Sequence, residues 1–432
     1  MGPARMTDPP VPPSVPLRAV DLAFRTAAGG PLAMGVMFDF SGEAPPLSAL
    51  RARIAARAGH LPALRYRVRM HDKTAYPVAE VDPADHVREL VVADAAELNA
   101  ARRQMLALPL PEGRPSWDVW LIRWAQKSFT VCFRSDHALR DAIAAANLCR
   151  LLIEDDPQLC SSPSPAGPVT LRGVATALAE SARSLRSFDL APAFGGAEAG
   201  TSRLFHTDTP LALLRTAARA HVATVNDVYL AALSAAVCRW HREGTHQGHP
   251  PMPVTMPLSV RPPDQSTTVG NALVGTRLTL PCESSGSVQE ALAAVTARTR
   301  RLREMNYRQS AGAVLGVLPR SLGARLVARV AGAGSVGMLA SNLNCGPSLT
   351  HFGVTARQAE MFSALAGGLR CYTALTGYGD NARLTVVHDD SLTHLPLLGK
   401  HWVAAVHELA TPVDRRADEH IIRRRDTIAH VR

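Results

Sequence analysis

The segment KSFTVCFRSDHALRDAIAAANLCRLL holds the two residues best suited to proton transfer, His137 and Asp141. A histidine side chain can take up or release a proton near neutral pH, and Asp141 supplies a carboxylate four residues later. The chain contains 16 histidines. A structural or merely exposed His137 therefore stays open as the alternative to a catalytic one.

The elements around this pair predict that it lies at a junction. Phe129, Val131 and Phe133 alternate with other residues as in a strand, and residues 142–152 have helical spacing. Residues 135–141 therefore connect a strand to a helix. A loop held by such rigid elements can direct a side chain into a cleft.

Four other residues invite a chemical interpretation. Cys132 lies on the strand that leads to this junction, and Cys345 lies in a predicted loop. Neither has a context that would lower the pKa of its thiol, so we expect both to pack in the interior. Asn226 and Asp227 precede a run of small residues and are expected to cap a helix.

The first 155 residues alternate between strand and helix patterns, which predicts a mixed sheet covered by helices. Strand patterns occur at 33–40, 63–70, 87–92, 117–125 and 129–133, and helical patterns at 47–58, 95–108 and 142–152.

Residues 156–203 differ in composition, because Pro, Ser and Gly clusters flank a single helical stretch at 171–185. This predicts a crossover linker between two halves of an α/β protein. We therefore expect a disordered leader (1–16), an N-terminal half (17–155), the linker and a C-terminal half (204–432). In the second half, helical patterns occur at 210–221, from 226, at 288–305 and at 400–409, and strand patterns at 253–260, 273–280, 336–341, 372–378 and 383–388.

The composition indicates a soluble globular protein. Of the 432 residues, 47% are hydrophobic and 19% are charged, which excludes collagen, coiled coils and wholesale disorder. The net charge of +10 is compatible with a polyanionic partner such as coenzyme A, an acidic carrier protein or RNA. Aromatic residues make up only 5% and do not alternate with basic ones, which argues against DNA and general nucleic-acid binding. The charge-dense end DRRADEHIIRRRD is expected to be a solvated helix or tail.

Cysteine spacing and hydropathy bear on the compartment. The seven cysteines contain no CxxC pair and suggest neither a zinc site nor a disulfide framework, so a reducing cytoplasm is expected. The Pro-rich leader lacks the apolar region of a signal peptide. No run of 18 apolar residues predicts a membrane span, and the nearest approach, 211–237, is interrupted by charged and polar residues.

Several segments resemble one known family in the order that the family requires. SDHALRDA is similar to a degenerate HHxxxDG motif of the bacterial wax ester synthase/diacylglycerol acyltransferase family, a branch of the chloramphenicol acetyltransferase and condensation-domain superfamily. PLRAVDLAFRTAAGGPLAMGVMFDF resembles the N-terminal strand region of that family, HLPALRYRVR its Pro-x-x-Arg-x-Arg segment, TVNDVYLAALSAAVCRW its Asn-Asp-Val helix, PVTMPLSVRP its Pro-x-Ser-Val-Arg strand and ASNLNCGP its Ser-Asn-x-Pro-Gly-Pro turn. The resemblance implies a two-domain chloramphenicol-acetyltransferase-like sandwich, with mixed sheets covered by helices and an active-site channel between the halves.

The motif departs from the family at two positions. Asp136 replaces the first histidine and Ala142 replaces the glycine, whereas His137 matches the second histidine, which the family uses as general base. The resemblance further implies that Asp141 forms an ion pair with Arg261 from the other half and so braces the catalytic loop. Asp136 is expected to point away from the channel. A carboxylate beside the imidazole would raise the pKa of His137 and shift its working range to higher pH.

The resemblance implies direct acyl transfer without a cofactor other than the thioester co-substrate. Neutral His137 would take the proton of an acceptor hydroxyl or amine as that atom attacks the thioester, and return it to the departing thiolate. Asn271, Ser341 and Asn342 are candidates for stabilising the oxyanion, although each is also a common turn or strand-end residue type.

The partners implied are acyl-CoA or an acyl carrier protein as donor, and a small-molecule acceptor. A specialised metabolite is as well supported as a fatty alcohol or diacylglycerol, because no amphipathic helix with a strongly basic face is found. Two alternatives remain: a catalytically inactive protein that binds a carrier or an enzyme, and a condensation-type transferase with a carrier-protein or, less favoured, aminoacyl-tRNA donor.

Overall fold

The computed structural model describes residues 11–69, 72–78, 81–160, 167–186, 194, 201–245, 251–282, 287–332 and 336–411. The expected disordered leader is therefore described only from residue 11 onward, where Val15 and Pro16 form a short strand, β1. The C-terminal tail lies outside the described residues.

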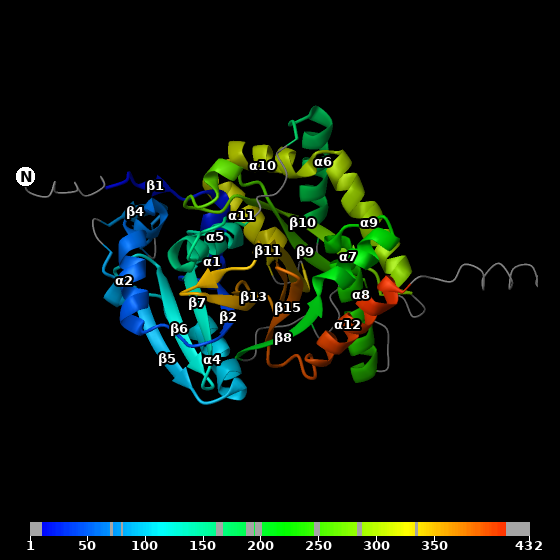
Figure 1. Ribbon diagram of the computed structural model, residues 1–432. Coiled ribbons are helices and arrows are strands. Elements are labelled where there is room, and N and C mark those ends of the chain that lie inside the picture. Colours follow the sequence, from blue (N-terminus) through cyan, green and yellow to red (C-terminus); the bar gives the residue numbers. More distant parts are fainter. Residues whose placement is uncertain are drawn as a thin grey trace, which may run out of the picture.

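Two mixed six-stranded sheets form the frame of the molecule (Figure 1). The strand order is β12–β13–β2–β7–β6–β5 in the first sheet and β10–β9–β11–β14–β15–β8 in the second, and β1–β4–β3 form a small antiparallel sheet. The strands are β1 (Val15–Pro16), β2 (Ala33–Ser41), β3 (Tyr66–Arg67), β4 (Thr74–Pro77), β5 (Val87–Val92), β6 (Trp117–Trp124), β7 (Ser128–Asp136), β8 (Ser202–Pro210), β9 (Met252–Ser259), β10 (Leu273–Leu280), β11 (Met338–Asn344), β12 (Thr350–His351), β13 (Val354–Ser363), β14 (Cys371–Tyr378) and β15 (Asn381–Asp389).

Helices surround the two sheets, and the buried apolar residues form two clusters. The first follows the first sheet but also includes Tyr372, Ala374 and Val387 of the second sheet, and the other follows the second sheet. The helices are α1 (Ala19–Ala28), α2 (Leu47–Ala58), α3 (Pro83–His86), α4 (Ala95–Ala107), α5 (Ala142–Ile153), α6 (Leu171–Ser184), α7 (Leu211–Ala220), α8 (Val225–Thr245), α9 (Val288–Glu304), α10 (Tyr307–Val317), α11 (Arg320–Ala331) and α12 (Leu397–Ala410), with 3₁₀ turns at Pro62–Arg65 and Pro263–Gln265. Most of the predicted strands and helices are present within a few residues of their expected ends.

The C-terminal half of the chain contributes one hairpin to the first sheet. Strands β12 and β13 come from the C-terminal half of the chain, yet β13 pairs with β2 and completes the first sheet. The expected division at residues 155 and 204 therefore needs a correction, because residues 350–363 belong to the N-terminal sheet. Gly35 permits this pairing: a Cβ atom there would lie 2.2 Å from the carbonyl oxygen of Phe133 and 2.8 Å from the ring of Phe362.

Local expectations fail in three places. Residues 63–70 were expected to form a strand, but Pro62–Arg65 form a 3₁₀ turn and only Tyr66–Arg67 pair with β4, while residue 70 lies outside the described residues. The segment matched to the N-terminal strand region begins with helix α1. The expected linker contains α6 as predicted, but its last residues already belong to β8.

The cysteines differ from expectation at one pair. Cys238 of α8 and Cys282, just after β10, form a disulfide with a Cα–Cα distance of 5.7 Å. The expectation of no disulfide is therefore wrong. The other five cysteines are buried, and burial raises the pKa of Cys132 and of Cys345. These two thiols therefore pack in the interior, as predicted, and lack the features of a nucleophile.

No single helix in the described part of the chain is long and apolar enough to cross a membrane. Helices α7 and α8 reach the required length and composition only as a pair bent by 95°.

Candidate active site

The predicted junction is the loop between β7 and α5, and both halves of the molecule hold it. The amide of His137 donates to the carbonyl oxygen of Leu32 at 2.8 Å, in the N-terminal half. From the C-terminal half, the amide of Gly270 donates to the carbonyl oxygen of Leu139 at 2.7 Å. Gly270 has φ +91°, a conformation that other residues rarely adopt, and this lets the loop approach closely. The motif loop is thus fixed at the interface of the halves.

His137 is oriented by one hydrogen bond and one ring contact. Its Nδ1 lies 3.1 Å from the carbonyl oxygen of Arg140, which can only accept, so Nδ1 carries the proton and Nε2 remains the basic nitrogen. The ring of Phe24 from α1 stacks on the imidazole with 3.8 Å between the ring centroids. Burial lowers the pKa of His137 and outweighs the opposing effects, among them the charge of Asp141. A raised pKa would have required a carboxylate effect stronger than burial; burial prevails, so the imidazole is neutral at physiological pH, as the resemblance implies.

Asp141 and Arg261 form the predicted ion pair across the two halves. The shortest contact joins Nη2 of Arg261 to Oδ2 of Asp141 at 2.8 Å, and Nε lies 3.0 Å from the same oxygen. Asp141 also caps α5 by accepting from the amide of Ala144, and it accepts from the amide of Ala272. Arg261 in addition donates to the carbonyl oxygens of Gln265, Thr268 and Gly270. The pair therefore anchors both the catalytic loop and the loop that covers it.

Asp136 is turned away from His137, as expected. Only 1% exposed, it forms an ion pair with Arg25 of α1 at 3.2 Å. Its Oδ1 accepts from the amides of Leu32 and Ala138. Burial raises the pKa of this carboxyl group despite these contacts. Asp136 thus holds the backbone of the loop and does not line the cavity.

Asn271 does not meet the expectation of an oxyanion donor. Its side-chain Nδ2 donates to Oδ1 of Asp21 at 2.8 Å and to the carbonyl oxygen of His137 at 2.6 Å, which uses both amide protons. It is also not among the residues that line the cavity. Asn271 instead ties the backbone of His137 to helix α1.

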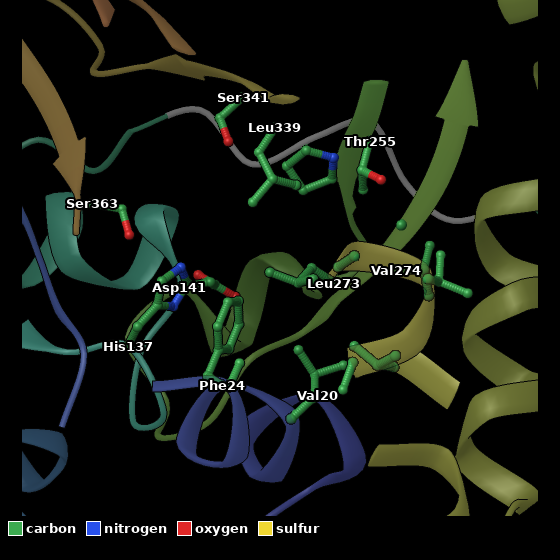
Figure 2. A pocket seen from close by; sticks show the side chains of 18 of the residues that line it. Val20, Phe24, His137, Asp141, Thr255, Leu273, Val274, Leu339, Ser341 and Ser363 are labelled. Carbon is green, nitrogen blue, oxygen red and sulfur yellow. The ribbon is translucent and has the colours of Figure 1, made fainter. Parts of the chain in front are cut away.

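A cavity of about 260 Å³ lies between the halves, with His137 and Asp141 on its wall (Figure 2). Ser341 and Asn342 also line it, so the structure brings them together with His137 in one cavity. Away from His137 the wall is largely apolar. Helices α1, α10 and α11 contribute Val20, Val314, Leu315, Leu326 and Val327 to it.

Thr255 of β9 is a lining residue that the sequence interpretation missed. It is 3% exposed, and its hydroxyl has no hydrogen-bond partner among the described residues. Threonine is common in strands, so its residue type does not mark this position as part of a site. Its unpaired hydroxyl is a polar group in an otherwise largely apolar wall.

One family model matches part of the chain. Residues 31–186 match the model of the wax ester synthase/diacylglycerol acyltransferase catalytic domain. No curated protein matches the chain in sequence.

Solved structures resemble the chain over most of its length. The wax ester synthase/diacylglycerol acyltransferase from Marinobacter aquaeolei VT8 is 18% identical, with 91% of this chain and 98% of that chain covered and a TM-score of 0.63. The first condensation domain of the calcium-dependent antibiotic synthetase is 16% identical, with 93% and 97% covered and a TM-score of 0.63. A cyclization-docking bidomain from Sorangium cellulosum is 12% identical, with 93% and 86% covered and a TM-score of 0.60. These likenesses confirm the predicted two-lobed α/β fold.

Proposed function

We propose that this chain, whose residues 31–186 match the wax ester synthase/diacylglycerol acyltransferase catalytic domain, moves an acyl group from a thioester donor to a hydroxyl or amine acceptor. In this proposal His137 is the general base. The donor is acyl-CoA or an acyl carrier protein, and the acceptor is a small molecule.

The protonation state and position of His137 are the main support for the proposal. The carbonyl oxygen of Arg140 holds the proton on Nδ1, so Nε2 is the nitrogen that can accept one. Burial keeps the imidazole neutral, and the side chain lies on the wall of the cavity between the halves. A neutral imidazole beside a largely apolar cavity has the properties that a general base for acyl transfer needs.

The proposed reaction needs one base and one oxyanion donor. Nε2 of His137 takes the proton of the acceptor while the acceptor atom bonds to the thioester carbonyl carbon. The carbon–sulfur bond then breaks, and the imidazolium returns the proton to the thiolate. Ser341 and Asn342 line the same cavity and are the candidates for hydrogen bonding to the oxyanion. The reaction requires no cofactor beyond the thioester itself.

A screen of donors and acceptors tests this function. Purified protein is incubated with short- and long-chain acyl-CoA and acyl-carrier thioesters against hydroxyl and amine acceptors, and products are identified by mass spectrometry. We expect acyl transfer with the wild type and a rate at least about 100-fold lower for His137→Ala. The matched control, His60→Ala, changes an exposed histidine and should react like the wild type.

Two results would contradict the proposal. Undiminished transfer by a folded His137→Ala variant would reject the general base. A wild type that reacts with no donor and acceptor pair would favour a protein that binds without catalysis, which is the alternative suggested by Asp136 at the first motif position.

A further inference from the structure

A second hollow, the basic groove, lies next to the catalytic cavity. It has a volume of about 890 Å³, within the range of small-molecule sites, and lies between the end of α1, the loop after α4 and residues 364–368. Four arginines and a single carboxylate are the charged residues that line it: Arg25, Arg67, Arg69, Arg114 and Glu112.

Two of the four arginines are already paired with carboxylates. Arg25 pairs with Asp136, and Arg114 pairs with Asp85. Arg67 and Arg69 form no ion pair with any described residue. The groove therefore has an excess of positive charge, which an anionic ligand would neutralise.

The structure holds the segment that carries both of these arginines. Nη2 of Arg25 donates to the carbonyl oxygen of Arg69 at 3.0 Å, and Nη1 of Arg67 donates to the carbonyl oxygen of Gly113 at 2.7 Å. The Nε atom of Arg67 is buried and has no hydrogen-bond partner among the described residues. Such a donor is costly to leave unpaired, and an acceptor on a bound anion would pair it. Arg67 is also the last residue of the Pro-x-x-Arg-x-Arg segment, to which the proposed reaction gives no role.

The basic groove meets the catalytic cavity along shared walls. Ala27, Leu32, Ala364, Ala366 and Gly367 line both hollows. Four of these five residues are small. The fifth, Leu32, accepts the backbone hydrogen bond of His137. A ligand in the groove would therefore lie next to the catalytic loop.

We propose that the basic groove binds the phosphate groups of a coenzyme A thioester, with Arg67 and Arg69 as the main phosphate ligands. This inference rests on the proposed function, because it places the thioester carbonyl near His137 and the acyl chain in the apolar cavity. Guanidinium groups bind phosphate oxygens with charge-assisted hydrogen bonds. Coenzyme A carries a diphosphate and a 3′-phosphate, whereas the prosthetic arm of a carrier protein carries one phosphodiester. Two arginines without a carboxylate partner among the described residues match the diphosphate and 3′-phosphate of coenzyme A better than a single phosphodiester.

Equilibrium binding tests the groove without requiring catalysis. Coenzyme A, 3′-dephospho-coenzyme A and pantetheine are titrated by calorimetry into the wild type, Arg67→Gln, Arg69→Gln and the double variant. We expect the Kd for coenzyme A to rise about tenfold or more in the double variant, while pantetheine, which lacks phosphate, binds all forms alike. Added salt should weaken coenzyme A binding to the wild type more than to the double variant. Arg219→Gln, at an exposed position on α7, is the matched control and should bind like the wild type.

The lysine variants Arg67→Lys and Arg69→Lys guard against a loss of fold. They keep the charge and should bind coenzyme A more tightly than the glutamine variants. The inference is overturned if the wild type does not bind coenzyme A, or if the double variant binds it as tightly as the wild type does. It is also overturned if only acyl carrier protein donates the acyl group and the arginine variants leave that transfer rate unchanged. If coenzyme A binding depends on the arginines but no acyl group is transferred to any acceptor, the proposed function is wrong and the coenzyme A site in the groove still stands.

Discussion

The two carboxylates beside His137 are both buried and paired with an arginine, but the pairs join different parts of the molecule. Asp141 meets Arg261 from the other half of the chain through Nε and Nη2, caps α5 and accepts an amide bond from Ala272. Asp136 meets Arg25 from its own half through one contact of 3.2 Å and otherwise accepts from backbone amides.

The Asp141 pair holds the two halves together, whereas Asp136 supports the catalytic loop within one half. The pair at Asp141 spans the interface at which the cavity lies, so losing it should affect both the fold and the site. Asp136 supports only one turn of the loop, and its raised pKa shows that burial disfavours its charge. An aspartate can therefore stand at position 136 in place of the motif's first histidine without disturbing the geometry of His137, provided that Asp141 is retained.

The largest effect on stability is expected for Asp141→Asn. It leaves Arg261 buried without its counter-charge, which should lower the free energy of unfolding by about 3–5 kcal/mol. Denaturant unfolding measures the loss. The matched control is Glu89→Gln, which removes a more exposed pair with Arg123 and should cost about 1 kcal/mol or less. Equal stabilities of Asp141→Asn and the wild type would show that the pair does not hold the halves together.

A smaller loss is expected for Asn271→Ala. Asp21 and the carbonyl oxygen of His137 would each lose a buried hydrogen bond, which should lower the free energy of unfolding by about 1–3 kcal/mol. The rate of acyl transfer should fall as well, because the backbone of His137 would be held less firmly. If Asn271→Ala transferred acyl groups more slowly but unfolded like the wild type, Asn271 would instead be a donor to the oxyanion.

Asp136→Asn should cost less than Asp141→Asn. The amide oxygen of asparagine can still accept from Leu32 and Ala138, and the variant loses mainly the charge attraction to Arg25. Arg25 is buried as well, but the raised pKa of Asp136 shows that burial already opposes its charge, so we expect a loss of only about 1 kcal/mol in denaturant unfolding. A loss as large as that of Asp141→Asn would remove the distinction between the two carboxylates.

The pH dependence of the rate sharpens the comparison further. A His137 pKa lowered by burial means that the base is already neutral somewhat below pH 6.5, so kcat/KM should fall only as the pH drops through that lowered pKa. Its acid limb should have a midpoint below 6.5. A midpoint above 6.5 would mean that a carboxylate charge, and not burial, governs the imidazole.

The sequence predicts the elements that have strong local signals. The strand and helix around the motif and the Asp141–Arg261 pair were predicted, the pair through family resemblance. Helices α10 and α11 were missed because small residues interrupt their apolar pattern: Gly323, for example, packs against Ala19 of α1. Helix α1 was missed as well. The pairing of β13 with the first sheet was also missed, because no local pattern shows which sheet a strand will join.

Contacts between distant residues also limit what the sequence can predict at the site. Asn271 lies near His137 as expected, but its amide is used by Asp21, 250 residues away in sequence. The bond between Cys238 and Cys282 spans 44 residues without a recognisable motif. Burial, and therefore the direction of the His137 pKa shift, depends on Phe24 and other residues that packing brings together.

The central claim is that the base is His137 and not the carboxylate beside it. The most direct test compares single-turnover rates of acyl transfer for the wild type, His137→Ala and Asp136→Ala with one saturating donor and acceptor. We expect His137→Ala to lose about 10²–10⁴-fold and Asp136→Ala to keep at least roughly a tenth of the wild-type rate. The reverse order, with His137→Ala active and Asp136→Ala inactive, would contradict the account.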